Sequence, residues 1–82
     1  MERFIVELTV ANHYGVLNRI TGLYARRKYN IDSLTVHETS DPALSMMRIV
    51  SRGDLVVQRQ MARQLRKLFD VKTVVLLNTS TL

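Results

Sequence analysis

The stretch with the clearest potential for ligand binding is the loop Asn12-His13-Tyr14-Gly15-Val16-Leu17. It lies where an alternating apolar run ends and a helical pattern begins, and Gly15 removes side-chain bulk where the backbone enters the helix. The first N–H groups of a helix lack intrahelical acceptors and form its positive end, which favours a small anion such as a carboxylate. On spacing alone, the alternative is favoured about two to one: Asn12 ends a strand and Gly15 turns the chain.

No group of residues predicts catalysis. His13 and His37 are the only histidines, they fall in different segments, and neither has an obvious carboxylate partner for acid–base work. The chain contains no cysteine, no Gly-rich phosphate loop and no metal-ligand spacing, so we expect neither a metal nor a cofactor in this chain. Turn and capping roles are sufficient for the aspartates at element boundaries, which are Asp32, Asp41, Asp54 and Asp70.

Length and composition predict one small globular domain. The chain has 82 residues, of which 46% are hydrophobic, and its formal net charge is +5. No apolar run is long enough to span a bilayer and the first residues lack a signal-peptide pattern, so we expect a cytoplasmic protein without membrane contact. A chain this short leaves much surface exposed, which favours self-association. The positive charge is compatible with a nucleic-acid partner, but most basic residues occupy the polar positions of two helical segments, as on solvated helix faces.

Hydrophobic periodicity predicts the element order βαββαβ in a single domain, residues 1–78, followed by a polar tail, residues 79–82. The strands are expected at Arg3–Val10, Ile31–Thr39, Leu44–Ser51 and Val71–Leu77, and the helices at Gly15–Lys28 and Leu55–Phe69. Asp54 is the expected N-cap of the second helix, and Asn30 is expected to end the first in a left-handed conformation. The last strand is apolar on both faces, so both are expected to be covered.

Right-handed crossovers in this order give a ferredoxin-like α+β sandwich, with two helices on one face of a four-stranded antiparallel sheet. Strands 3–10 and 44–51 are expected at the centre of the sheet, and strands 31–39 and 71–77 at its edges. An edge strand can pair with a copy of itself, so we expect a homodimer through strand 31–39 and helix 15–28. Gly22, inside that helix, predicts close packing against a neighbouring element.

The face of the sheet opposite the helices is expected to carry an apolar patch. Ile5, Met46 and Val50, together with Val74 or Leu76, would form it beside Arg48 and His37. Such a patch usually marks a surface that a partner covers.

Longer motifs give the chain a family resemblance. They are Asn12-x-x-Gly15-Val16-Leu17, Arg19-x-x-Gly22-Leu23, Tyr29-Asn30-Ile31-x-Ser33-Leu34-Thr35-Val36, Thr39-x-Asp41-Pro42-x-Leu44-Ser45-x-Met47 and Gln64-Leu65-x-Lys67-Leu68-x-Asp70-Val71. With these residues the chain resembles an ACT domain, and more narrowly the small regulatory subunits of acetolactate synthase (acetohydroxyacid synthase). The resemblance runs from about Phe4 to Val75 and reverses the odds against a ligand-binding loop.

The resemblance implies a regulatory, non-catalytic function. Small subunits of this family bind a branched-chain amino acid, typically valine, between two ACT domains, and they activate and feedback-regulate the large catalytic subunit. Thiamine diphosphate, Mg and FAD would then belong to that catalytic partner alone. The effector site implied for this chain combines Asn12, Gly15, Val16 and Leu17 of one copy with Asn30 and Ile31 of the other. Apolar atoms of Leu8, Val10 and Ile31 would enclose the effector side chain.

Two departures and two alternatives accompany this resemblance. Many family members continue into a second domain, whereas this sequence ends at Leu82, and His13-Tyr14 is bulkier than the residues usual in that loop. A stand-alone ACT-type amino-acid sensor for another enzyme or regulator is the first alternative. The second is an RNA-binding ferredoxin-like module, which would need stacking aromatics on the open face of the central strands. Phe4 is expected on the core face instead.

Overall fold

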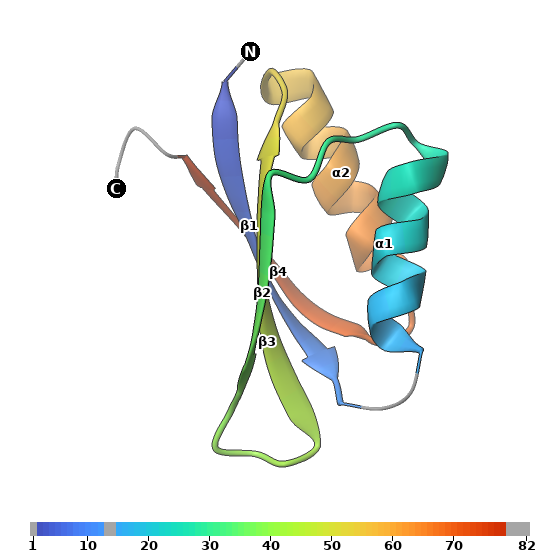
Figure 1. The fold of residues 1–82 in the computed structure, drawn as a ribbon, viewed down its shortest axis with the longest axis vertical. Coiled ribbons are helices and arrows are strands. Elements are labelled where there is room, and N and C mark those ends of the chain that lie inside the picture. Colours follow the sequence, from blue (N-terminus) through green and yellow to red (C-terminus); the bar gives the residue numbers. More distant parts are fainter. Residues whose placement is uncertain (1, 13–14, 79–82) are drawn as a thin grey trace.

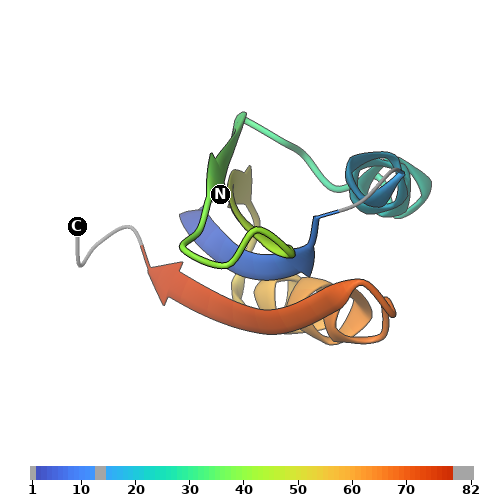
Figure 2. The ribbon, with the colours of Figure 1, turned by 90° about the horizontal axis from the view of Figure 1, so that it is seen from below.

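The six elements follow one another in the predicted order in a computed structural model, which describes residues 2–12 and 15–78. They are β1 (Arg3–Ala11), α1 (Val16–Arg26), β2 (Ser33–Glu38), β3 (Leu44–Arg52), α2 (Leu55–Arg66) and β4 (Val71–Asn78). The antiparallel sheet has the order β2-β3-β1-β4, and both helices lie on one side of it (Figures 1 and 2). The predicted ferredoxin-like sandwich is thus confirmed, while the predicted tail, 79–82, lies outside the described residues.

Alternation along β1 builds the core. Phe4, Val6 and Leu8 point to the helices and are almost completely buried, at 1%, 0% and 1% exposure. In register with Val6 and Leu8, Ile49 and Met47 of β3 lie on the same face. The two helices cover these side chains with the buried residues Val16, Ile20, Leu23, Tyr24, Met61 and Leu65. Since Phe4 lies in this core, as predicted, the described part of the central strands β1 and β3 offers no aromatic side chain to the open face.

Helix α1 ends two residues earlier than predicted, and Lys28 is the left-handed residue rather than Asn30. Lys28 has φ 58° and donates its N–H to the carbonyl of Ala25, and Tyr29 donates to the carbonyl of Tyr24. This pair of bonds forms a Schellman motif, which satisfies carbonyls at the end of the helix. The motif also brings the rings of Tyr24 and Tyr29 into a T-shaped contact, with centroids 6.0 Å apart.

Helix α2 begins as predicted and ends at Arg66 instead of Phe69. The Asp54 side chain accepts a hydrogen bond from the N–H of Val57 at 2.9 Å, which confirms the predicted N-cap. At the other end the N–H groups of Lys67 and Leu68 bond to carbonyls three residues back, so the last turn tightens and the helix stops.

Strand β2 begins at Ser33, two residues later than predicted. The residue before it, Asp32, connects the start of β2 to β3 and β1. Its N–H donates to the carbonyl of Val50, and its carboxylate accepts a hydrogen bond from Arg52 at 2.8 Å and lies 3.5 Å from Arg3. The Arg52 hydrogen bond lowers the pKa of the Asp32 carboxyl below its usual value, against the opposing effect of desolvation. Ile31 therefore lies in the connection before the strand rather than in it.

One prediction about the open face is wrong. The register places Val6 opposite Leu76 and Leu8 opposite Val74, so Val74 and Leu76 face the helices. Leu77 and Val75 replace them on the open face beside Ile5, Val50 and Met46. The bulge between Thr9 and Val10 does not affect this part of β4. Val75 is 48% exposed, so β4 is covered on only one face by the described chain.

An ion pair that the sequence analysis does not predict connects α1 to the residue before β4. The guanidinium of Arg19 contacts the Asp70 carboxylate at 2.7 Å through Nε and at 2.5 Å through an Nη atom. The Asp70 side chain is only 6% exposed, whereas that of Arg19 is 54% exposed. The boundary position of Asp70 predicts a turn or capping role, and it does not reveal a partner 51 residues away.

We expect Arg19→Met to lower the free energy of unfolding by about 2–3 kcal/mol, because it removes this cation from a nearly buried carboxylate. The matched control is Arg48→Met, which removes an arginine paired with Glu7 on the open face, where Arg48 is 50% exposed. An exposed pair of this kind contributes about 0–1 kcal/mol. Urea unfolding of both variants at one protein concentration measures the difference, and equal losses would contradict it.

Candidate functional site

The predicted ligand loop places an uncapped helix terminus at the surface. Gly15 is the N-cap of α1, has φ 83° and offers no side chain to the helix. The first helical hydrogen bond runs from the N–H of Arg19 to the carbonyl of Gly15, so the amides of Val16, Leu17 and Asn18 have no acceptor within the helix. The first turn also has no acidic side chain. This end of α1 therefore offers backbone donors and a positive dipole to a small anion.

The structure changes the reason for glycine at position 15. A Cβ atom there would meet nothing within 4 Å, so the described chain leaves enough room for a side chain at this position. The left-handed φ of 83° is the constraint, since side chains rarely adopt it without strain. The adjacent residues His13 and Tyr14, which the sequence marked as bulky, lie outside the described residues.

Asn12 is oriented by the β2–β3 hairpin. Its backbone N–H donates to the carbonyl of Ala43 at 2.8 Å, and its side-chain Nδ2 donates to the carbonyl of Pro42 at 3.2 Å. The hairpin is itself fixed, because the Thr39 hydroxyl bonds the backbone on both sides of the Asp41-Pro42 turn. A carbonyl partner can only accept, so the amide nitrogen of Asn12 faces Pro42 and its Oδ1 is left as an acceptor.

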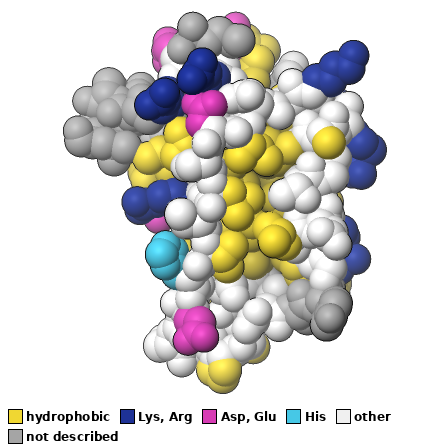
Figure 3. Space-filling view, in the orientation of Figure 1, with side chains coloured by type: hydrophobic (Ala, Val, Ile, Leu, Met, Phe, Trp, Pro, Cys, Tyr) yellow, Lys and Arg dark blue, Asp and Glu magenta, His cyan; other side chains and the backbone are white. Residues whose placement is uncertain are grey.

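A cavity of about 110 Å³ opens beside this loop, between α1 and the sheet. It is lined mainly by apolar side chains, namely Val10, Ala11, Val16, Leu17, Val36 and Met47, together with Asn12 and Ser45. Figure 3 shows apolar side chains gathered in the band between β2 and α1, where Val36 and Leu17 are 49% and 46% exposed. Of the three residues expected to enclose an effector side chain, Val10 lines the cavity, while Leu8 and Ile31 do not.

The other half of the predicted site lies at the opposite end of α1. Asn30 and Ile31 follow the helix, whose 11 residues begin beside the cavity. An 11-residue helix is roughly 16 Å long, so one chain does not bring the two halves together. Asn30 donates from Nδ2 to the Asp32 carboxylate at 2.5 Å, which leaves its Oδ1 as an acceptor, as in Asn12. A site that combines both predicted halves would therefore need a second copy of the chain.

The described residues contain no group of three His, Asp or Glu side chains placed to hold a metal ion. Across residues 2–12 and 15–78, no helix has the length and apolar character needed to cross a membrane.

The order of the elements and the topology of the sheet are those of an ACT domain. The ACT domain from the GTP pyrophosphokinase of Chlorobium tepidum superimposes with a TM-score of 0.73 at 20% identity over 93% of this chain and 97% of that one, which shows the common fold. Residues 6–73 match the family described as the AHAS small subunit-like ACT domain. The chain belongs to this family, the ACT domains of acetolactate synthase small subunits.

Individual relatives agree with this assignment. The acetolactate synthase isozyme 3 small subunit of Escherichia coli is 47% identical over 88% of this chain and 44% of its own length. The small subunit of Bacillus subtilis is 46% identical over 85% of this chain and 41% of its length. The crystal structure of the small subunit from Thermotoga maritima gives a TM-score of 0.87 at 36% identity, covering 93% and 47% of the two chains. This chain thus spans less than half the length of these relatives.

We expect the chain to dimerise through β2 and α1, because the cavity and the exposed Val36 lie at that edge. Sedimentation at concentrations on the order of tens of micromolar should show a dimer. Val36→Glu should yield a monomer, since it places a charge in the apolar band between β2 and α1. Val56→Glu is the control, because Val56 is 63% exposed on α2 and lies away from that edge. A monomeric wild type, or dimers of all three proteins, would contradict the assignment.

The close packing predicted at Gly22 is not found within the described chain. A Cβ atom at Gly22 would approach only the side chain of Arg26, at 3.4 Å, so no neighbouring element of the described chain packs closely there.

Proposed function

We propose that this chain is the effector-binding ACT domain of an acetolactate synthase small subunit, and that it binds a branched-chain amino acid, with valine favoured, between two copies. The observation that carries the proposal is the division of one polar site between the two ends of α1. One end offers free backbone N–H groups, and each end offers an asparagine whose Oδ1 is left as an acceptor. Two equivalent sites per dimer follow from the two-fold axis.

Each part of an α-amino acid has a suitable counterpart. The carboxylate would accept hydrogen bonds from the amides of Val16 and Leu17, at the positive end of the helix dipole. The ammonium would donate to Oδ1 of Asn12 and to Oδ1 of Asn30 from the second copy. The cavity of about 110 Å³, roughly the share of three to four water molecules, suits a short branched aliphatic side chain.

Regulation of a catalytic partner is the function that we assign to this binding. The relatives are named as small subunits of acetolactate synthase, and their likeness covers most of this chain. In the proposed complex, the large subunit alone holds thiamine diphosphate, Mg and FAD and performs the reaction. The ACT dimer activates that subunit, and the amino-acid effector reverses the activation. Co-purification with the large subunit distinguishes this function from that of an amino-acid sensor for another enzyme.

Calorimetric titration with valine, leucine and isoleucine tests the effector site. Asn30→Ala should weaken binding by about 1–3 kcal/mol, because the ligand ammonium loses a buried acceptor. Gln60→Ala, which removes an exposed amide from α2, is the control and should bind as the wild type does. Equal affinity in all three proteins would place the site elsewhere, and no heat with the wild type would contradict effector binding.

The open face of the sheet is the surface that we assign to the catalytic subunit. Ile5, Val50 and Leu77 align across β3, β1 and β4. Met46, which pairs with Thr9 two cross-strand rows further along the same face, is 39% exposed. A contiguous apolar patch within a polar rim is typical of a protein-binding surface. The ion pair between Arg48 and Glu7, at 3.1 Å, borders Ile5, Val50 and Leu77 and separates them from Met46.

Met46→Glu should weaken association with the large subunit at least about tenfold, because it replaces an exposed apolar side chain of the proposed contact face with a charge. The domain should stay folded, since Met46 is not part of the core beneath the helices. Val56→Glu, on α2, provides a control with the same new charge. Pull-down and activation assays with the large subunit measure the effect, and normal activation by Met46→Glu would show that this face is not the contact.

A further inference from the structure

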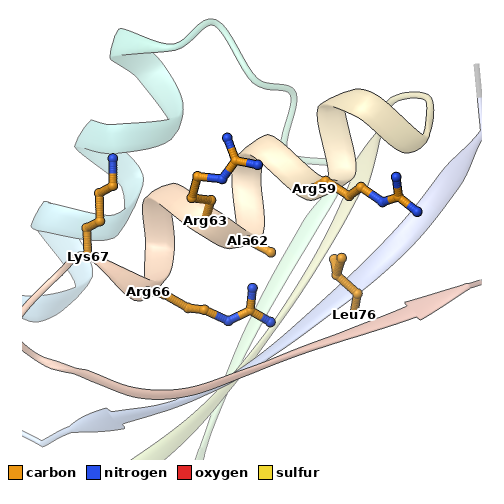
Figure 4. Close-up of a pocket in the computed structure, with 6 residues that line it drawn as sticks. All are labelled: Arg59, Ala62, Arg63, Arg66, Lys67 and Leu76. Atoms are coloured by element: carbon orange, nitrogen blue, oxygen red, sulfur yellow. The ribbon is translucent and has the colours of Figure 1, made fainter.

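A basic groove runs between α2 and β4, on the opposite side of the molecule from the β2 edge. It has a volume of about 450 Å³, and Figure 4 shows its lining along one side of α2. Two apolar residues, Ala62 and Leu76, contribute to it, and every other lining residue is a cation. These four cations are Arg59, Arg63, Arg66 and Lys67.

The four cations have no acidic partner among the described residues, in contrast to the arginines of the sheet and to Arg19 of α1. The described ion pairs all use Arg3, Arg19, Arg48 and Arg52. Helix α2 contains no acidic residue at all. Within the groove, Arg66 donates a hydrogen bond at 3.4 Å to the backbone carbonyl of Val74, which leaves its positive charge without a counter-charge.

Helix stability accounts for only part of this charge. Arg63 is three residues from Arg66 and four from both Arg59 and Lys67, so these side chains are neighbours on the helix surface and repel one another. The negative end of the helix dipole favours cations in the last turn, where Arg63 and Arg66 lie. Arg59 stands one turn earlier, outside the reach of that effect. A bound anion would relieve the repulsion along the whole groove.

The arrangement of the cations favours a chain-like anion. Their side chains spread along the helix rather than converging on one point (Figure 4). From Arg59 to Lys67 the helix advances roughly 12 Å, which is longer than a single phosphate group needs. None of the lining residues is aromatic, so the stacking platform of single-stranded nucleic-acid sites is missing from this groove. Ala62 and Leu76 instead offer apolar contact to an aliphatic side chain.

We propose that this groove binds an acidic, extended segment of a partner protein, with its carboxylates on the arginines and an aliphatic side chain against Leu76. The groove adjoins β4, the sheet edge opposite β2. A dimer formed through β2 and α1 would therefore present one groove on each outer side. The inference goes beyond amino-acid binding and does not depend on it.

A fluorescein-labelled peptide of alternating glutamate and leucine is the probe, and fluorescence anisotropy measures its binding to the 82-residue chain. Arg59→Gln/Arg66→Gln should weaken binding at least about tenfold, because two desolvated charge pairs are lost. Arg26→Gln/Arg27→Gln is the matched control: it removes the same charge from exposed positions at the end of α1 and should change affinity less than about twofold. Added salt should weaken binding to the wild type.

Several results would overturn the proposal. Equal losses in both double variants would show attraction to net charge alone, and equal binding of a glutamine–leucine peptide would exclude the carboxylates as the recognised groups. Tighter binding of an oligouridine of similar length, lost in the groove variant, would identify a nucleic-acid site instead. The absence of saturable peptide binding below millimolar concentration would also refute it. The salt series and the glutamine peptide use the wild type, so the test does not depend on the folding of the variants.

Discussion

The carboxyl end of β1 is connected by hydrogen bonds and an ion pair to residues of the β4 side, the β3 side and α1. The candidate site depends on these contacts. Ala11 donates its N–H to the carbonyl of Asp70, on the β4 side, and Asn12 donates to the carbonyl of Ala43, on the β3 side. The Asp70 carboxylate contacts Arg19 of α1, which connects the helix to the same point. The position and direction of α1 relative to the strand end are therefore set before any ligand binds, and the first turn of α1 presents its amides at a fixed place. Loss of the Arg19 contact would disturb the site as well as the stability of the fold.

Helix α1 has left-handed residues just outside both ends, and they have different consequences. At the carboxyl end, Lys28 closes a Schellman motif that satisfies the helix carbonyls within the chain. At the amino end, Gly15 has no side chain to cap the helix, and the amides remain available. A glycine N-cap costs only roughly a few tenths of a kcal/mol relative to a capping side chain, so the uncapped end forgoes a small amount of stability, which the proposed effector carboxylate would restore on binding. In the proposed complex, this exchange would link effector occupancy to the rigidity of α1.

Sequence patterns within single elements predicted the fold well. They did not predict the contacts between elements that are distant in the sequence. The alternation in β1 placed Phe4 correctly, and Asp54 was correct as an N-cap because both depend on neighbouring residues. Val74 and Leu76 were placed on the wrong face because β4 is apolar throughout and its sequence does not reveal its register with β1. The contacts of Asn12 with Pro42 and of Arg19 with Asp70 join residues 30 and 51 positions apart, for which periodicity has no signal. The separation of Asn12 from Asn30 required the length of α1 in three dimensions.

The charges divide the surface into regions of different character. On the open face, Arg48 is paired with Glu7, so the apolar patch has a nearly neutral polar rim. On α2 the cations stand without carboxylates, and the net charge of +5 is concentrated there as a result. A neutral rim favours a close apolar contact, whereas an unpaired basic groove favours attraction to an acidic chain that weakens with salt. The two surfaces therefore differ in the physical basis of recognition, and one partner can use both only if it offers an apolar patch and an acidic segment on different sides of the sheet.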